Sequence, residues 1–225
     1  TYSPSNNTAS ADVTEPNSCI SCPAGYYCTL GSVAPIECGV GYYSNASSFV
    51  CTICPLGHYC GSNTTSYIAL SFGGGSWDRS GDASGVCFNG TYCGIGMTHV
   101  PDLTNDACAA GYYCPSGTPY PLTCPAGTYS SGTGQDELSD CIDVPAGFYS
   151  VLASTSVTGM CSPGYYCPTR ATGPNQVQCP PRYYRPEYGG RSIADCSLCV
   201  AGGSCPTASV EPLICPQGYY CTTGV

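Results

Sequence analysis

Lysine is absent from this chain, and basic residues amount to only five arginines in 225 residues. Charged residues make up 8% of the sequence, and its 14 acidic side chains leave a formal net charge of −9. Proteins that bind nucleic acid need a basic stripe to neutralise phosphates, so this charge argues against a nucleic-acid partner. It argues in the same way against attraction to an anionic membrane surface.

Long apolar runs are absent as well. No stretch approaches the ~18 apolar residues of a transmembrane helix, so we expect no membrane span within this sequence. Leu and Ile are sparse, and the chain has one Trp and four Phe, so a large aliphatic core is not expected. Proline and glycine interrupt every segment before helical periodicity develops, which predicts short strands, turns and loops.

The chain is rich instead in cysteine (21), glycine (29), proline (20) and tyrosine (20). Cysteine at this density is typical of disulfide scaffolds that mature in an oxidising, secretory compartment. Cross-links then supply the stability that a small core cannot. We therefore predict an extracellular or cell-surface protein with a small disulfide-rich fold, mostly irregular with short β-hairpins and without a large hydrophobic core.

One seven-residue motif recurs along the whole sequence, and Cys161-Ser-Pro-Gly-Tyr-Tyr-Cys167 is a clear copy of it. Its positions 1 to 7 read Cys, usually Pro, any residue, Gly, two aromatic residues, and then Cys or another residue. Successive copies follow one another at short intervals, and so short a period predicts an elongated linear array of cysteine-rich repeats. Copies 1 to 11 start at Cys22, Cys38, Cys54, Cys87, Cys108, Cys124, Val144, Cys161, Cys179, Cys199 and Cys215.

Each copy has a readable local chemistry. Proline presets φ for the first corner of a turn, and the glycine two residues later accepts a positive φ. The aromatic pair then favours an extended strand. Because successive strand side chains point to opposite faces, one ring can cover a disulfide while the other faces a neighbour or solvent.

The spacing of the cysteines within copies predicts ten disulfides. In seven copies a second Cys follows six residues after the first, which gives a short loop. In three copies position 7 is Ser44, Ser130 or Arg185, and the next Cys lies further along the chain, which gives a longer loop. Copy 7 lacks both cysteines, having Val144 and Ser150 instead, as expected when bonded partners are lost together. The proposed pairs are Cys22–Cys28, Cys38–Cys51, Cys54–Cys60, Cys87–Cys93, Cys108–Cys114, Cys124–Cys141, Cys161–Cys167, Cys179–Cys196, Cys199–Cys205 and Cys215–Cys221.

An interlocked arrangement, in which the first cysteine pairs with the third and the second with the fourth, is the alternative pairing. Either way, one cysteine remains over, and the local scheme leaves Cys19 unpaired within this sequence. Its place is that of a residue that closes a longer loop, so we expect its partner upstream. With the last copy also cut within a unit, the sequence is expected to be a segment of a longer array.

The longest interval between copies, from Cys54 to Cys87, is about two periods, so we expect a decayed copy near Leu70–Gly75 or else a hinge. The other segment boundaries follow from the positions of the copies. The expected segments are an exposed linker at 1–18, repeats at 19–60, a degenerate repeat or hinge at 61–86, repeats at 87–143, a repeat without disulfide at 144–160, and repeats at 161–225.

Chemically active side chains are few. The three Cys-x-x-Cys pairs, at Cys19, Cys51 and Cys196, have metal-like or redox-like spacing, but the first Cys of each is better explained as closing one loop and the second as opening the next. His58 replaces a motif tyrosine, and His99 lies in a loop. The acidic groups around Asp136–Asp140 and Asp102–Asp106 lack the alternating spacing of a calcium loop. We expect no catalytic site, metal site or cofactor, and no enzyme activity.

Four Asn-x-Ser/Thr sequons predict N-linked glycans on surface loops of a secreted chain. They are Asn6, Asn45, Asn63 and Asn89. We therefore expect covalent N-linked glycans at these four asparagines.

The unit C-x-x-C-P-x-G-Y-Y-C-x9-C-x-x-G-Y-Y-S, at Cys19–Ser44, resembles the cysteine-rich repeats named after the ephrin-receptor ectodomain. The Cys38–Cys51 loop also resembles the first disulfide loop of tumour necrosis factor receptor repeats. Long tandem arrays with this GYYC pattern are typical of large surface proteins of algae and other protists, including the mastigoneme proteins of flagellar hairs. The resemblance implies a glycosylated, secreted, rod-like structural protein, with the flagellar surface as one location.

The sequence therefore favours a structural subunit of an extracellular filament or surface coat that self-associates. A filament needs a repeating heterologous contact, for which the tyrosine faces and residues 61–86 with Trp77 are candidates. The alternative is a receptor or adhesin ectodomain, a monomer that binds a protein or glycan ligand through an exposed apolar patch. A secreted enzyme would require a deep pocket around His99.

Overall fold

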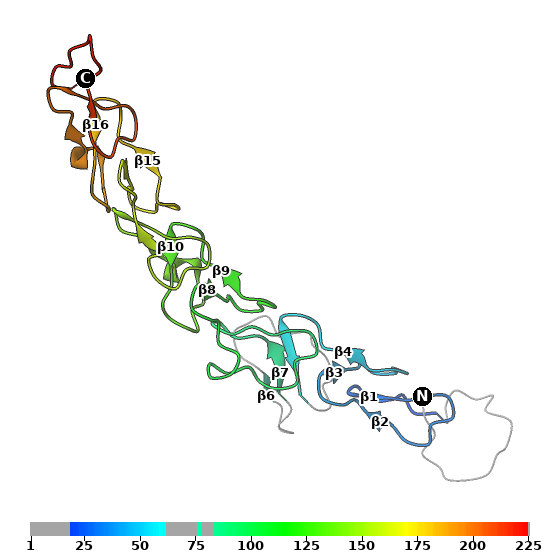
Figure 1. Ribbon diagram of the computed structural model, residues 1–225. Coiled ribbons are helices and arrows are strands. Elements are labelled where there is room, and N and C mark those ends of the chain that lie inside the picture. Colours follow the sequence, from blue (N-terminus) through cyan, green and yellow to red (C-terminus); the bar gives the residue numbers. More distant parts are fainter. Residues whose placement is uncertain (1–18, 62–75, 78–82, 225) are drawn as a thin grey trace. The chain divides into compact units, whose positions relative to one another are not determined.

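The computed structural model describes residues 19–61, 76–77 and 83–224. The chain separates into two units, one made of residues 1–108 and 114–121 and the other of residues 109–113 and 122–225. Short antiparallel strand pairs make up nearly all the regular structure in both units, and Figure 1 shows such pairs where β3 lies beside β4 and β8 beside β9. The predicted disulfide-rich, hairpin-rich fold is confirmed.

In the first unit, each hairpin starts at the aromatic pair of a copy and returns just before the next copy begins. The strands are β1 (Tyr26–Tyr27) with β2 (Ile36–Glu37), β3 (Tyr42–Tyr43) with β4 (Thr52–Ile53), and a three-stranded sheet of β5 (His58–Cys60), β7 (Ala83–Val86) and β6 (Ser76–Trp77) in that spatial order.

The second unit repeats the same hairpin six times. Its pairs are β8 (Tyr112–Tyr113) with β9 (Leu122–Thr123), β10 (Thr128–Tyr129) with β11 (Ile142–Asp143), β12 (Phe148–Tyr149) with β13 (Gly159–Met160), β14 (Tyr165–Tyr166) with β15 (Val177–Gln178), β16 (Tyr183–Tyr184) with β17 (Ser197–Leu198), and β18 (Gly203–Ser204) with β19 (Leu213–Ile214). Single 3-10 turns, η2 (Leu138–Asp140) and η3 (Ile193–Asp195), lie in the two longest disulfide loops.

A tight turn precedes the first strand of every hairpin. The N–H of position 5 donates to the carbonyl of position 2 in all eleven copies, as from Tyr26 to Pro23 at 3.3 Å. Position 4 is the second corner, and its φ, 85° in Gly25, is that of a type II turn. The predicted positive φ at position 4 is therefore confirmed. The prediction that the position-2 proline takes the first corner is wrong, because its carbonyl starts the turn and position 3 takes the corner.

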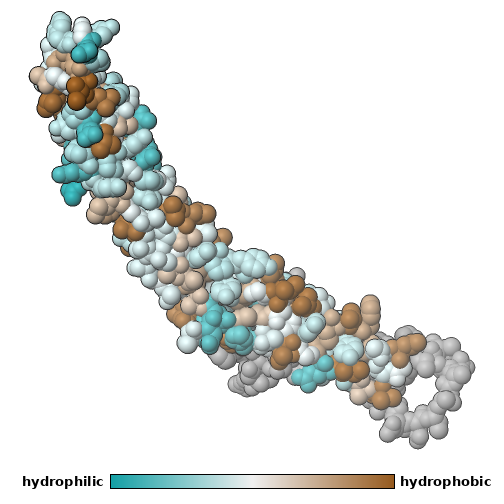
Figure 2. Space-filling view, viewed as in Figure 1, coloured by the Kyte–Doolittle hydropathy of each residue, from teal (hydrophilic) through white to brown (hydrophobic). Residues whose placement is uncertain are grey.

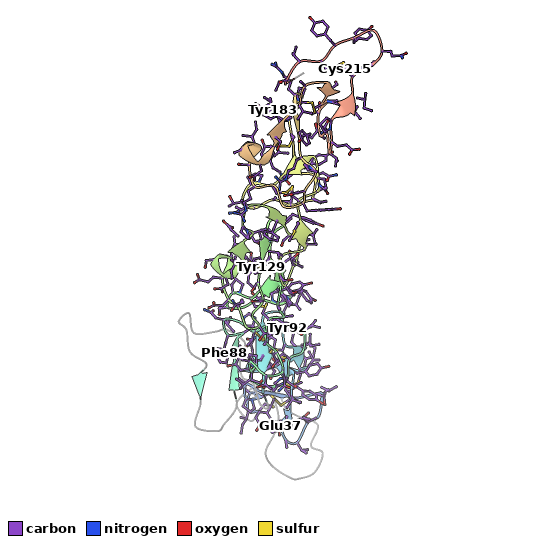
Figure 3. All side chains as sticks on the ribbon, turned by 60° about the vertical axis from the view of Figure 1, so that its left-hand side comes forward. Glu37, Phe88, Tyr92, Tyr129, Tyr183 and Cys215 are labelled. Carbon is purple, nitrogen blue, oxygen red and sulfur yellow. A yellow bond between two sulfur atoms is a disulfide. The ribbon has the colours of Figure 1, made fainter. Side chains whose placement is uncertain are left out.

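Disulfides, flanked by tyrosine rings, form the interior of both units, and Figure 3 shows their sulfur atoms along the ribbon. Tyr165 (position 5 of copy 8) and Tyr149 (position 6 of copy 7) pack against the buried pair Cys161–Cys167. In the first unit, Tyr59, at position 6 of copy 3, packs on the cysteines of copy 4 and is 1% exposed. Position 6 thus covers the disulfide of the next copy in both cases.

Candidate functional site

The ten disulfides of the structure are the ten pairs that the copy alignment proposes, and no interlocked pair occurs among the described residues. Their Cα–Cα distances, 5.6 to 6.0 Å, lie in the ordinary range. In the Cys51–Cys54 spacing, Cys51 closes the loop from Cys38 and Cys54 opens the next. Cys19 is a free cysteine.

The site that recurs throughout the chain is the contact between one copy and the next, which we call the joint. At each joint the position-4 residue of one copy uses both of its backbone groups. Its N–H donates to the position-7 carbonyl of the next copy, and its C=O accepts from the position-1 N–H of that copy. All ten joints have both bonds, at 2.8 to 3.0 Å. Copies are therefore linked by the same backbone geometry whatever their side chains.

Outer hydrogen bonds reinforce most joints. The N–H at position 10 of the next copy donates to the position-1 carbonyl, as from Arg170 to Val144 at 3.0 Å. The N–H at position 7 donates to the carbonyl at position 11 of the next copy, as from Ser150 to Ala171 at 3.1 Å. Where both are present, these bonds bracket the first strand of the hairpin.

Position 10 was not singled out by sequence reasoning, although it carries the same backbone requirement as position 4. Four residues there have a positive φ without being glycine, namely Ser47, Ala153, Arg170 and Ala208. The signal that could have found this position is glycine, which occupies it in copies 1, 4, 5 and 11.

Position 4 also contacts the copy two places further on. A Cβ added at Gly41 would lie 2.7 Å from the carbonyl oxygen of Gly96, and one at Gly147 would lie 2.8 Å from that of Gly189. This close approach explains why glycine is needed there for a second reason besides its φ. Arg182 is the exception, with a φ of 82°, and its Nε donates to the carbonyl of Gly224, the equivalent acceptor.

The two longest disulfide loops, Cys124–Cys141 and Cys179–Cys196, are each closed by an aspartate before the second cysteine. Oδ2 of Asp140 accepts from the backbone N–H groups of Asp136 and Glu137, both at 3.0 Å. Oδ2 of Asp195 accepts from Arg191 N at 2.6 Å. These N–H donors are the main cause that lowers the pKa of each carboxyl, with the charges of nearby arginines adding to the effect at Asp195. Both carboxylates therefore act as caps, not as free ligands.

Arg185 takes the place of a cysteine at position 7 of copy 9. Its guanidinium donates to the carbonyl oxygens of Asp195 at 2.8 Å and Tyr188 at 3.0 Å. In the other copies without a short disulfide, Ser44, Ser130 and Ser150 are buried at position 7. The position thus stays inside the fold when the cross-link is missing.

The histidines occupy separate places. Nδ1 of His58 lies 3.1 Å from the carbonyl oxygen of Leu56, within the turn of copy 3. Nε2 of His99 lies 3.0 Å from Oδ2 of Asp106, and about half of the His99 side chain is exposed. The Asp102 carboxyl accepts from the Asn105 side chain and from backbone N–H groups, which lowers its pKa. The contact between His99 and Asp106 closes this loop.

Two of the four predicted sequons can be placed. Asn45 lies exposed just after β3, and Asn89 lies exposed at the first corner of the turn in copy 4. Asn6 and Asn63 lie outside the described residues. Most of the predicted degenerate repeat or hinge also lies outside them, yet copies 3 and 4 share an ordinary joint, in which Gly57 N donates to Cys93 O at 3.0 Å.

The described part of the chain shows few other candidate sites. No group of three or more His, Cys, Asp or Glu side chains is placed there to hold a metal ion. Within the same residues, no helix has the length and apolar character needed to cross a membrane. A shallow hollow lies beside η2, lined by Pro125, Leu138, Ile142, Asp143 and Arg170 among others.

No family model matches the chain. A similar protein among the curated ones is "ABC transporter G family member 28" of Arabidopsis thaliana, which is 28% identical over 128 residues. That match covers 56% of this chain and 9% of the relative, so the chain spans a small fraction of the curated protein it matches.

Proposed function

We propose that the chain is a structural segment of an extracellular, glycosylated filament or surface coat. The observation that carries the proposal is the joint, whose two backbone hydrogen bonds recur at all ten contacts between neighbouring copies. Since these bonds do not depend on side chains, copies can be added without a new interface for each. The disulfide content fits a protein of an oxidising, extracellular compartment.

Glycosylation is part of the proposal. Asn45 and Asn89 are exposed, as an acceptor for an N-linked glycan must be. Glycans at these sites would cover the first unit with polar material and leave the joints undisturbed, because the joints are made by backbone atoms. Mass spectrometry of glycopeptides is expected to find both asparagines occupied in the secreted protein.

Electron microscopy of the purified, secreted chain under non-reducing conditions tests the assembly. Filaments or sheets that persist in buffer and disappear after reduction of the disulfides are the expected result. A uniformly monomeric chain at all concentrations would contradict a structural role through self-association.

The exposed apolar side chains of copies 1 and 2 favour a second function, an adhesin or receptor ectodomain. Leu30 is 106% exposed, Phe49 77% and Val33 72%, and they occupy the loops of two adjacent hairpins. Figure 2 shows hydrophobic side chains of this kind lying among hydrophilic ones on the surface. If these side chains form one contiguous apolar patch, they mark a surface of the kind that binds a partner.

Under this second function the chain stays monomeric, and Leu30→Ser with Phe49→Ser abolishes binding to intact cells or their matrix. The same pair of substitutions leaves a filament unaffected if the apolar loops are not its contacts. Comparing assembly and cell binding in one variant therefore separates the two functions.

A further inference from the structure

The basic residues of this chain are concentrated in one segment. Residues 170–191 contain four of the five arginines and a single acidic residue, Glu187, for a net charge of +3. The rest of the chain has one arginine and 13 acidic residues, for a net charge of −12. The segment is therefore basic within an otherwise acidic chain.

Three of these arginines lie at contacts between position 4 of one copy and the copy two places further on. The backbone carbonyl of Arg170 abuts Gly127 of copy 6. Cγ of Arg191 would lie 3.2 Å from a Cβ at Gly147 of copy 7. Arg182 itself occupies position 4 of copy 9. We call Arg170, Arg182 and Arg191 the arginine seam.

The seam is accessible. All three residues are exposed, and the Arg170 side chain is 60% exposed although it lies 3.4 Å from Oδ1 of Asp143. The acidic groups that face the seam are Asp143 and Asp195, and the Asp195 carboxylate is already engaged by the Arg191 backbone N–H. The fourth arginine, Arg185, is committed to the carbonyls inside its loop, so it does not belong to the seam.

Acidic residues outside the 170–191 segment lie in both units. The described residues of the first unit include Glu37, Asp102 and Asp106 and contain no arginine or lysine, whereas the second unit has seven acidic residues beside its four arginines. Glu37, at the end of β2, is exposed, whereas the Asp102 carboxylate is already engaged by the Asn105 side chain and backbone N–H groups. Planar guanidinium groups are well suited to carboxylates because they can donate two parallel hydrogen bonds.

We infer that the arginine seam binds exposed carboxylates on a second copy of the chain. This inference rests on the proposed structural function and identifies its partner surface. Because basic and acidic surfaces belong to different regions of one polypeptide, their contact is heterologous and leaves a free surface of each kind for the next molecule. A contact of that type propagates, as a filament or coat requires.

Sedimentation velocity of the intact chain, at low and at high salt, tests the inference with Arg170→Gln/Arg191→Gln. These two substitutions leave unchanged the hydrogen bond from Arg182 to Gly224 and the hydrogen bonds that Arg185 makes within its loop. The charge-preserving control is Arg170→Lys/Arg191→Lys. We expect the Gln variant to associate about tenfold more weakly at low salt, since two exposed ion pairs are lost. The Lys control retains most of the association, and salt near ~1 M weakens it because the Debye length falls to ~3 Å.

Glu37→Gln, the variant of the acidic surface, is also expected to weaken association at low salt. Association of the wild-type chain that is indifferent to salt and to both variants overturns the inference and leaves the proposed function standing. A wild-type chain that never associates overturns the proposed function as well. Binding of the seam to heparin in the absence of self-association overturns the inference in favour of an anionic polysaccharide partner.

Discussion

At the scale of single residues, one position carries the structure. Position 4 combines a positive φ, two joint hydrogen bonds and a close approach from the copy two places on. The sequence predicts the first of these, because glycine beside a tight turn is a local signal. The close approach depends on a copy far along the chain, and no local pattern reports it. For the same reason Ser47 and Ala153, which have a positive φ at position 10, are not recognisable without the structure.

Gly164→Ala tests this crowding. Gly164 has a φ of 80°, and an added Cβ would collide with the backbone carbonyl of Ala208. We expect a loss of about 1–3 kcal/mol in the stability of the surrounding copies, from strain at a position that favours glycine. Chemical denaturation with intact disulfides measures it. Gly202→Ala is the matched control, since Gly202 has a φ of 82° at position 4 of copy 10 and a Cβ there meets nothing within 4 Å. Equal stability of the two variants would show that the carbonyl moves aside without cost.

Asp140 gives a prediction about pH. Backbone N–H groups of Glu137 and Asp136 lower the pKa of its carboxyl in the folded state. A carboxyl with a lowered folded pKa contributes stability above its unfolded pKa of ~3.9, and that contribution is lost as the pH falls through the folded value. Asp140→Asn is therefore expected to reduce the loss of stability between about pH 5 and pH 2. Thermal unfolding across this range measures it, with Glu211→Gln, a surface change, as the control; an unchanged pH profile would contradict the cap.

At the scale of the hairpin, the first strand does two things at once. Its aromatic pair supplies the strand, and in copies 3 and 7 its position-6 ring covers the disulfide of the next copy. The alternation of strand side chains predicts that one ring covers a disulfide, but it does not say which copy that disulfide belongs to. The number of residues between the two strands of a hairpin, in contrast, varies from copy to copy. Copy 3 starts at Cys54 and copy 4 only at Cys87, yet the two form the same joint, and β5 of copy 3 pairs with β7 just before copy 4.

Tyr149→Ala tests the role of the position-6 ring. Tyr149 packs against Cys161, Cys167 and Ala171. Its ring also lies over Gly159 on the partner strand, where an added Cβ would be 3.1 Å from a ring carbon. Removing it leaves a cavity beside the disulfide and is expected to cost about 2 kcal/mol or more. Reduction of Cys161–Cys167 by dithiothreitol should then be several-fold faster, as measured by thiol alkylation and mass spectrometry. Tyr188→Ala, at a 65% exposed ring, should leave the rate unchanged. Equal reduction rates would mean that the joint alone protects the bond.

At the scale of the whole molecule, the chain is held together locally. Every disulfide links residues no more than 17 positions apart, so cross-links stabilise copies and joints connect them. This arrangement could be predicted from the sequence to the level of individual pairs, because copies that lose a cysteine lose or relocate its partner too. The backbone pairing at the joints could not be predicted, since it involves groups that every residue carries.

Copy 7 is the copy that has no disulfide. Val144 and Ser150 are fully buried in the places of the two cysteines, and the joints on both sides of the copy are intact. Val144→Cys with Ser150→Cys should therefore form an additional short disulfide, like the pairs six residues apart elsewhere in the chain. The chain-entropy model gives a gain of about 2 kcal/mol for a loop of this size.

Non-reducing mass spectrometry shows whether the new bond forms, and limited proteolysis within 142–160 shows what it does. We expect cleavage there to slow about tenfold or more if opening of copy 7 limits it, because a tenfold change corresponds to about 1.4 kcal/mol. The single variant Val144→Cys is the control for loss of the valine. If the disulfide forms and cleavage does not slow, copy 7 is already as firmly held by its joints as its neighbours are by their cross-links. The joints, not the disulfides, would then be the main source of order along the chain.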